Sequence, residues 1–397
     1  MSEKPISLET ALDRCLPYIK PGYKEIIPIE YAYKRVAAED IFTPVNIPLF
    51  AHSMVDGFAL HAADINKLQQ EKEIKLAIAG TMAAGDKERQ SLAAGQTIRI
   101  MTGAMLPDGT AAVVKKETVR EAYEQVYFNQ QIKPGLNIQN CGDRVKRGEP
   151  IAFAGEVFGI NETETIASSG TARVAVFEIP PVYVINTGSE LVLPGEHRLD
   201  GQIFASNKTF YFSLLTAAGC HPLSGKGPVN DEIDAIAQEL HNGINMSRLV
   251  IISGGTAVGQ YDLVMAAFKQ IGAEIIFAGL ELKPGRHSAA AAKDGVLLFN
   301  LPGNPGAGYI IFEILVKPLL RKLSGISAYQ NHWFELVVSD HDSSESTQRI
   351  MVKGGAEINN GQLCARILNK SEKSGSLIKL IIDINQAGSG KRGLIVD

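Results

Sequence analysis

The sequence predicts a multidomain α/β protein whose central part is a doubly wound, largely parallel sheet. Strand-like and helix-like segments alternate over residues 180–325, which is the pattern of such a sheet. Short apolar runs separated by Gly, Asp and Pro turns fill residues 45–150, and similar runs return after about residue 327. A chain of 397 residues has room for two to four domains, so these three textures are read as separate domains.

Composition excludes several classes of function. The formal net charge is −4 and Lys and Arg are scattered, which argues against nucleic acid or an anionic membrane as the main partner. No signal-like segment or membrane-length apolar run occurs, so a cytoplasmic protein is expected. The four cysteines (Cys15, Cys141, Cys220, Cys364) are far apart, which favours neither a zinc site nor a disulfide framework.

The segments before the central sheet have local signals of their own. Ser7 is expected to cap a helix that Pro17 ends. Strands are expected at 74–79, 97–101 and 111–115 in a small β-rich domain, a sandwich or a barrel. Residues 144–177 are mixed, with a short helix at 163–168 and a strand at 173–177.

In the central part, apolar periodicity and start signals place the elements in order. Strands are expected at 182–186, 249–253, 273–277 and 296–300, and helices at 207–218, from 231 onward, at 261–271 and at 306–323. Asn207 and Asp231 are interpreted as residues that start helices.

Four loops that follow these strands have similar chemistry. Ligands of open α/β sheets bind beyond the carboxyl ends of the strands, so glycines and hydroxyls there indicate a binding edge. The plainer interpretation of any one loop is an ordinary turn, and four on one edge favour a site. The loops are Thr187-Gly188-Ser189-Glu190, Ser253-Gly254-Gly255-Thr256, residues 279–286 and Leu301-Pro302-Gly303-Asn304-Pro305.

The last of these loops is the most informative. Pro302 and Pro305 fix the backbone around Gly303 and Asn304, and a helix is expected to open at Pro305. Backbone N–H groups at such a helix start can hold an anion, so the sequence predicts an anion site here.

Charged side chains near the same edge suggest what the anion is. Glu190, Asp231 and Asp262 could hold Mg²⁺ that bridges substrate phosphates, although Asp231 and Asp262 could instead only favour helix N-termini. Lys283 and Arg286 flank a stiff Pro-Gly pair and could bind oxyanions, with solvated surface cations as the alternative.

Two further candidates lie in the β-rich segment. Asp56 stands at an Asp-Gly turn, and Thr102 follows the strand at 97–101. Taken alone, both are ordinary hairpin features.

Together these motifs resemble the molybdopterin molybdenumtransferase family, the group of bacterial MoeA and the gephyrin E-domain. The matching segments occur in order along nearly the whole chain: 54–59, 99–104, 187–191, 252–259, 282–285 and 301–305. The resemblance implies an elongated N-terminal domain made of 1–44 and 144–177, an inserted β-rich domain at 45–143, an α/β molybdopterin-binding domain at 178–326 and a C-terminal β-barrel at 327–397.

The resemblance also implies a reaction. The family transfers molybdenum from molybdate to the dithiolene of adenylylated molybdopterin and releases AMP with Mg²⁺. It implies a homodimer in which Asp56 and Thr102 reach the α/β site of the partner, with molybdopterin adenylyltransferase and apo-molybdoenzymes as candidate partners. Carried over by position, Glu190, Asp231 and Asp262 would serve the Mg²⁺–phosphate end. Ser376 and either Arg349 or Lys353 would lie near molybdate, and Thr187, Gly188, Ser253, Gly254, Gly255 and the loop at 302–305 would line the cofactor site.

The chain departs from the family pattern around the expected site. Gln139 and Arg144 replace an arginine and an acid, Ala205 and Gln260 replace acids, and Arg286-His287 replaces Lys-Pro. Three other interpretations therefore stay open: a paralogue that binds molybdopterin as carrier or regulator, a related adenylyl- or nucleotide-handling enzyme, and a scaffold.

Overall fold

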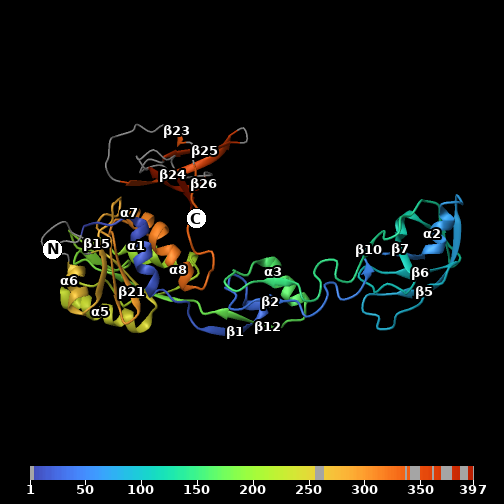
Figure 1. The fold of residues 1–397 in the computed structure, drawn as a ribbon, viewed down its shortest axis with the longest axis horizontal. Coiled ribbons are helices and arrows are strands. Elements are labelled where there is room, and N and C mark those ends of the chain that lie inside the picture. The colour runs from blue at the N-terminus through green and yellow to red at the C-terminus, as the bar shows by residue number, and fades with distance from the viewer. Residues whose placement is uncertain are drawn as a thin grey trace. The chain divides into compact units, whose positions relative to one another are not determined.

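The computed structural model describes residues 4–254, 263–335, 338–339, 349–359, 362–367, 378–384 and 392–396. The chain divides into two compact units (Figure 1). The first unit contains Met1–Glu39, Ala154–Phe158 and Val174–Asp397, and the second contains Asp40–Phe153 and Gly159–Arg173. Within the described ranges, no helix has both the length and the apolar character needed to cross a membrane.

The first unit is built around a six-stranded sheet. Its order is β16 (His221–Leu223), β13 (Pro181–Asn186), β17 (Leu249–Ser253), β21 (Val296–Leu301), β20 (Ala289–Lys293) and β18 (Glu274–Ala278). The first four strands are parallel, and β20 is antiparallel to both of its neighbours. The register aligns Asn186 with Ser253 and Ser253 with Leu301, so three strands end at one level. The predicted largely parallel sheet is therefore confirmed.

Strand β20 was missing from the sequence-based prediction. It is a run of four alanines and a lysine, and alanine has a low strand propensity. All four alanines are buried between β18 and β21, so packing in the sheet overrides the local preference.

Helices cover both faces of this sheet (Figure 1). One face packs on α1 (Leu8–Cys15), α4 (Ser206–Ala217), α7 (Pro305–Ile311) and α8 (Lys317–Leu323), and the other on α5 (Ile233–Met246) and α6 (Leu263–Gln270). Strand residues alternate between the two cores: Val184 and Ile251 face the first, whereas Ile185 and Ile252 face the second. Ser7 caps α1 as predicted, since its hydroxyl accepts from the Thr10 amide at 3.1 Å.

Two predicted helix starts are wrong, and one predicted helix is interrupted. The N-cap of α4 is Ala205 and that of α5 is Glu232, so neither Asn207 nor Asp231 has the predicted capping role. The helix expected at 306–323 is interrupted by a π-helical turn at Phe312–Val316. Pro318 explains the interruption, because proline lacks an N–H and clashes with the carbonyl four residues earlier. That carbonyl, of Ile314, accepts from the side chain of Asn331 at 3.4 Å.

The C-terminal part of the first unit is a second sheet. Its described strands are β22 (Phe334–Glu335), β27 (Arg392–Ile395), β26 (Ile378–Ile384), β24 (Arg349–Asn359), β25 (Gln362–Ile367) and β23 (Val338–Ser339) in spatial order. The short strand β19 (Leu282–Lys283) leaves the central domain and pairs in parallel with β24. The predicted β character of this region is thus confirmed. Also in this unit, β1 (Lys24–Pro28) pairs with β12 (Arg173–Phe177).

The second unit contains the β-rich segment. Its main sheet has the order β7 (Thr110–Lys115), β4 (Gly57–His61), β6 (Gln96–Ile100), β5 (Ile74–Met82), β9 (Gln125–Phe128) and β8 (Arg120–Ala122). Helix α2 (Ala62–Leu68) contributes Ile65 and Leu68 to its core. Two short ladders, β3 (His52–Ser53) with β10 (Ile138–Gln139) and β2 (Ile41–Phe42) with β11 (Pro150–Ala152), precede helix α3 (Ile160–Ser168).

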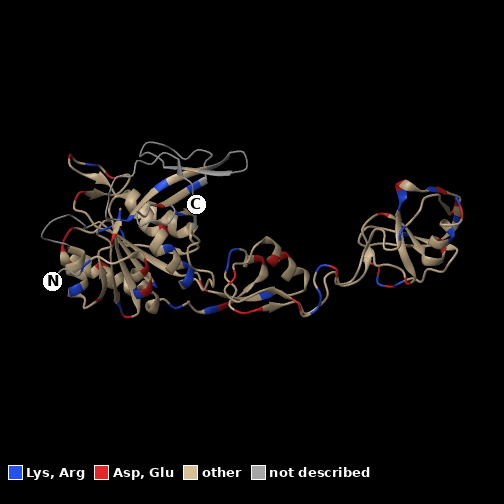
Figure 2. Cartoon of the chain, turned by 45° about the horizontal axis from the view of Figure 1, so that its top comes forward, with Lys and Arg blue, Asp and Glu red and all other residues tan. Residues whose placement is uncertain are grey.

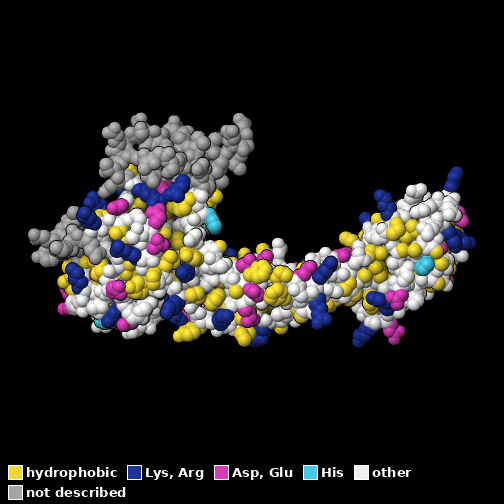
Figure 3. All heavy atoms as spheres, viewed as in Figure 1, with side chains coloured by type: hydrophobic (Ala, Val, Ile, Leu, Met, Phe, Trp, Pro, Cys, Tyr) yellow, Lys and Arg dark blue, Asp and Glu magenta, His cyan; other side chains and the backbone are white. Residues whose placement is uncertain are grey.

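Charges of both signs are interspersed on the described part of the chain (Figure 2). The face drawn in Figure 3 likewise has Lys and Arg side chains scattered among Asp and Glu, with no large area of one sign. Such a surface gives no long-range attraction to a polyanion, so any anion site must be local.

Candidate active site

Three loops meet at the carboxyl edge of the central sheet, and we call this place the rim. The loops follow β13, β17 and β21, and contain Thr187, Gly254 and Gly303. Gly254 has φ +118°, and a Cβ there would overlap the carbonyl oxygen of Thr187. A Cβ at Gly303 would lie 3.6 Å from the Cα of Gly254. The backbones of the first two loops are therefore in close contact, which glycine alone permits at Gly254, and the third loop lies one side-chain atom away from them.

Asp231 is joined to the first of these loops by hydrogen bonds. Its Oδ1 accepts from the Thr187 hydroxyl at 2.6 Å, and its Oδ2 accepts from the Ser189 amide at 3.3 Å. The Asp231 amide in turn donates to the Ser189 hydroxyl at 3.2 Å. The structure thus unites Thr187 with Asp231 as the sequence predicted, in a loop contact rather than at a helix start. Neighbouring Glu190 is exposed, and its carbonyl accepts from the Ile203 amide at 2.9 Å.

Asn207 connects the other two loops. Its side-chain nitrogen donates to the Ser253 hydroxyl and to the Gly303 carbonyl, both at 2.8 Å. Ser253 is buried at the end of β17, and Asn207 lies in the first turn of α4. Sequence reasoning identified Asn207 only as a cap and missed this role. The signal that could have found it is an amide side chain opposite two predicted strand ends.

The predicted anion site at the start of α7 is already satisfied by the protein. Asn304 caps this helix, and its Oδ1 accepts from the amides of Gly306 and Ala307 at 2.9 and 3.2 Å. Pro305 has no N–H to offer. The expectation that this helix start presents free backbone donors is therefore wrong, because a side chain that the sequence placed in the turn takes them.

The fourth loop joins β18 to β20 at the same edge. Two backbone bonds close it, from Gly279 N to Ser288 O at 2.9 Å and from Leu280 N to Arg286 O at 3.0 Å. Lys283 and Arg286 are exposed, and neither side chain has a hydrogen-bond or ion-pair partner among the described residues. They are free to meet a ligand, although the structure does not hold them together.

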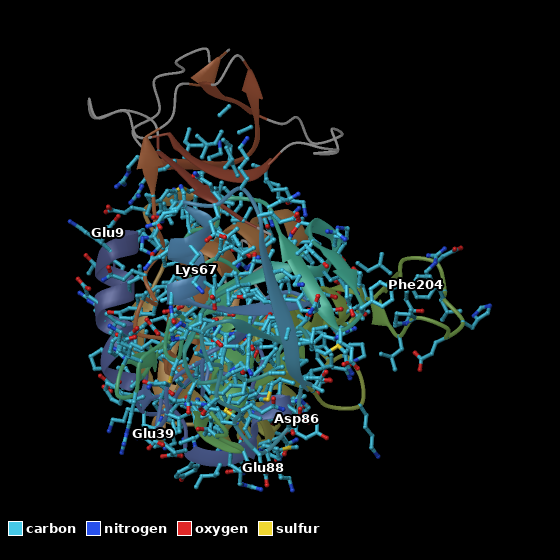
Figure 4. All side chains as sticks on the ribbon, turned by 90° about the vertical axis from the view of Figure 1, so that its right-hand side faces the viewer. Glu9, Glu39, Lys67, Asp86, Glu88 and Phe204 are labelled. Carbon is cyan, nitrogen blue, oxygen red and sulfur yellow. The ribbon has the colours of Figure 1, made fainter. Side chains whose placement is uncertain are left out.

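The two basic candidates of β24 have different surroundings. Arg349 is paired twice: its Nε lies 3.0 Å from both carboxylate oxygens of Asp383, and its Nη1 lies 2.7 Å from Glu9 Oε1. Burial alone would raise the pKa of Glu9, but the hydrogen bond from Arg349, a backbone hydrogen bond and the charges of Arg349 and Arg392 together outweigh it, so that pKa is lowered. Glu9 lies on α1 (Figure 4). Lys353 is exposed, with its Nζ 4.9 Å from the centre of the Tyr309 ring on α7.

A second polar cluster lies in the second unit. Asp56 accepts from the Thr102 amide at 2.8 Å, from the Thr102 hydroxyl at 2.9 Å and from Lys116 Nζ at 3.3 Å. The two Thr102 bonds and then the Lys116 bond lower the pKa of Asp56, so this exposed carboxylate is anionic at neutral pH. The predicted pair Asp56 and Thr102 is brought together. Lys116 was missed, although the pairing of Gly57 with Lys115 places it beside Asp56.

Three predicted residues lie outside the described residues: Gly255, Asp262 and Ser376. Within the described ranges, no three His, Cys, Asp or Glu side chains gather as a metal site. The rim still offers the hard oxygen donors that Mg²⁺ takes, in the Asp231 carboxylate and the Thr187 hydroxyl. Because Mg²⁺ commonly uses one or two carboxylates and completes its shell with phosphates and water, this chemistry fits the ion.

The atypical residue Arg144 has a structural partner. Its Nη1 lies 3.2 Å from Glu164 Oε1, and its Nη2 donates to the Thr165 hydroxyl at 2.8 Å on α3. Ala205 is buried and its amide donates to the Val192 carbonyl at 2.8 Å. The segment that precedes Ala205 along the chain, residues 191–204, contains Phe204, which projects from the surrounding ribbon in Figure 4.

Comparison with known proteins agrees with this architecture. Residues 6–170 match the family model for the MoeA N-terminal region (domain I and II), and residues 183–322 match that for a probable molybdopterin binding domain. The chain is 31% identical over 322 residues to a molybdopterin molybdenumtransferase of Bacillus subtilis, covering 80% of this chain and 74% of that protein. It is 31% identical over 330 residues to one of Haemophilus influenzae, covering 83% and 79%. The crystal structure of a molybdopterin biosynthesis MoeA protein from Pyrococcus horikoshii OT3 is similar, with a TM-score of 0.79 and 25% identity over 99% of this chain and 100% of that one.

Proposed function

The chain belongs to the molybdopterin molybdenumtransferase family, and from this premise we propose that it transfers molybdenum from molybdate to the dithiolene of adenylylated molybdopterin, with release of AMP. The observation that supports the proposal is the gathering of three glycine-bearing loops at one sheet edge, beside a hydrogen-bonded carboxylate. A diphosphate and a tetrahedral oxyanion both need such closely approachable backbone and nearby polar groups.

The residues of the proposed site have different roles. Thr187 and Asp231 hold the phosphate end of the nucleotide through their oxygen atoms, together with Glu190 and Asp262. Exposed Lys283 and Arg286 supply cationic donors to oxyanions, and the Pro302–Pro305 turn shapes the wall of the site. When bound, Mg²⁺ neutralises phosphate charge at Asp231 and favours departure of AMP.

A second copy of the chain completes the site in this proposal. Asp56 is an anion with a neighbouring Lys116; the carboxylate would supply negative charge, and the ammonium group of Lys116 a donor, to the rim of the partner. The arrangement requires a homodimer, which is common among proteins of this size. The C-terminal sheet would close as a barrel, with Ser376 and either Arg349 or Lys353 near molybdate. Molybdopterin adenylyltransferase would deliver the substrate and an apo-molybdoenzyme would receive the product, all in the cytoplasm.

The testing experiment is cofactor assembly in vitro. Purified chain, adenylylated molybdopterin, molybdate and Mg²⁺ are mixed, and AMP release and reconstitution of an apo-molybdoenzyme are followed together. Both signals should depend on molybdate and on Mg²⁺. Release of AMP without reconstitution would favour a nucleotide-handling enzyme instead.

One observation favours a second candidate, a carrier that binds molybdopterin with little turnover. Ala205 is buried at the N-cap of α4, two residues before Asn207, and the resemblance to the family leads us to expect an acid at this position. Ala205→Asp should then raise the rate of AMP release, whereas an already efficient enzyme would gain nothing.

A further inference from the structure

Asn207 makes the one side-chain connection that the described residues show between the ends of β17 and β21. Its two amide hydrogens go to two different loops, the Ser253 hydroxyl and the Gly303 carbonyl, each at 2.8 Å. These strands are neighbours, since Ser253 pairs with Leu301 in the register. Asn207 therefore fixes the distance between two adjacent loops of the rim.

The support beneath Asn207 is rigid. Tyr211, one turn further along α4, is almost fully buried, and its ring lies 6.4 Å from that of Phe312. A Cβ at Gly308 of α7 would overlap the Tyr211 hydroxyl, so the two helices are in close contact. Burial raises the pKa of Tyr211, which keeps this phenol neutral. This buried packing therefore holds the first turn of α4, and with it Asn207, in place.

The rim is also closely packed on the side of Thr187. Gly254 follows Ser253 directly and is pressed against the Thr187 carbonyl, and the Thr187 hydroxyl holds Asp231. If the bonds of Asn207 were lost, the Gly303 carbonyl and the Ser253 hydroxyl would each be left without this donor. Such polar groups then seek new partners, and the contact between Gly303 and Gly254 changes with them.

We propose that Asn207 is a positioning residue for the reaction at the rim: it sets the spacing of the Ser253–Gly254 and Pro302–Gly303 loops at which a diphosphate or oxyanion can contact both. This inference rests on the proposed function, which it deepens. A shift of about 1 Å in such a spacing is enough to cost roughly 100-fold in rate.

The test uses Asn207→Asp in the full-length chain. The substitution keeps the shape of the side chain and exchanges its two donors for acceptors, so it repels the Gly303 carbonyl. The matched control is Asn242→Asp on α5, because the Asn242 side chain donates at 2.9 Å to Glu239 within the same helix. Thermal unfolding, AMP release with kcat and KM separated, and calorimetric binding of AMP and of molybdate are measured for each.

We expect Asn207→Asp to lower kcat at least tenfold with a folded, cooperatively unfolding chain, and to weaken AMP or molybdate binding. Its activity should recover as the pH falls, because a protonated carboxyl can again donate to the Gly303 carbonyl. Wild type and Asn242→Asp should show neither effect. A purely structural residue would lower the unfolding temperature without producing this inverted pH profile.

The results of these measurements separate the inference about Asn207 from the proposed function. Wild-type kcat and binding in a folded Asn207→Asp chain overturn the inference, as does a loss of activity that matches the loss of folded protein. If the wild type binds AMP or molybdate without turnover, the proposed function fails, and Asn207 is judged on binding alone. If the wild type neither binds nor turns over, both are refuted. Should Asn207→Asp fail to fold, Ser253→Ala removes one of the two bonds by itself and should give the kcat loss without the pH recovery.

Discussion

At the rim of the central sheet, Ser253 is 1% exposed, and beside it the backbone of Gly254 contacts the carbonyl of Thr187. In the second unit, the Asp56 side chain is 41% exposed and is paired with Lys116, whose side chain is 57% exposed. The first arrangement is held by buried hydrogen bonds and by packing that leaves no room for a Cβ at Gly254. The second is held by hydrogen bonds that water can compete with. The fold therefore fixes the positions of the rim atoms, whereas the charged side chains of the Asp56 cluster can change position. The two regions should respond to substitution in opposite ways.

The largest expected effect is that of Gly254→Ala. The added methyl group overlaps the Thr187 carbonyl at a φ of +118°, so about 1–3 kcal/mol of stability should be lost. AMP release should fall roughly 100-fold, because the loops move apart. Calorimetric unfolding and the AMP assay measure the two losses.

Gly219→Ala is the matched control for that change. Gly219 has φ +76° with nothing within 4 Å of a Cβ, so it carries backbone strain without overlap. It should cost roughly 1 kcal/mol and leave AMP release unchanged. Equal losses of AMP release in both variants would show that backbone strain, rather than contact between the loops, causes the loss of activity.

The next effect tests whether the two regions work across a dimer. Asp56→Asn and Asp231→Asn chains should each be inactive on their own and folded. When they are mixed and allowed to exchange subunits, half of the dimers are mixed, and each has one intact site, so about a quarter of wild-type activity should return. AMP release after mixing measures it.

The control for this mixture is Asp231→Asn with Gly254→Ala, two changes on the rim side of the shared site. That pair restores no intact site, so activity should stay at the level of the variants alone. Recovery in the control, or none in the first mixture, would contradict a site shared between subunits.

A smaller effect distinguishes the hydroxyl group of Thr187 from that of Thr102. Thr187→Val removes the hydroxyl bond to Asp231, and bonds to charged groups contribute about 1.5–3 kcal/mol, so KM for the nucleotide should rise roughly tenfold. In Thr102→Val the backbone amide still donates to Asp56 at 2.8 Å, so the change should be severalfold smaller. Steady-state kinetics compare them; a larger effect at Thr102 would reverse the contrast.

The smallest effect concerns pH. The pKa of Asp56 is lowered by Thr102 and then by Lys116, so the stability that this carboxylate contributes is present above its ordinary pKa of about 3.9 and is lost as pH falls through the lowered value. Lys116→Ala should move the pKa of Asp56 upward, toward that ordinary value. Carboxyl ¹³C NMR titration reports it, and Thr187→Val should leave it unchanged. An unmoved pKa in Lys116→Ala would remove Lys116 from the cluster.

Sequence patterns located the rim because strand ends and glycines are local signals. Thr187, Asp231, Asp56 and Thr102 were each named as candidates, but their pairing through hydrogen bonds is seen only in the structure. What could not be predicted depends on partners distant in sequence. Asn207 looks like a cap, and only the fold brings it to Ser253 and Gly303.

Two other misses have the same origin. Strand β20 requires two neighbours that overcome the low strand propensity of alanine. Lys116 requires the register of β4 with β7, which hydrophobic pattern alone does not fix. In each case a tertiary contact outweighs the local preference.

Helix α1 has a consequence for how the first unit opens. Its residues Ala11 and Cys15 belong to the same hydrophobic cluster as Ile381 and Val396, and Glu9 reaches Arg349. Segments that are far apart along the chain therefore share one core, so opening of either segment exposes apolar side chains of the other to water. Amide hydrogen exchange should accordingly report α1 and β26 as parts of one cooperative unit.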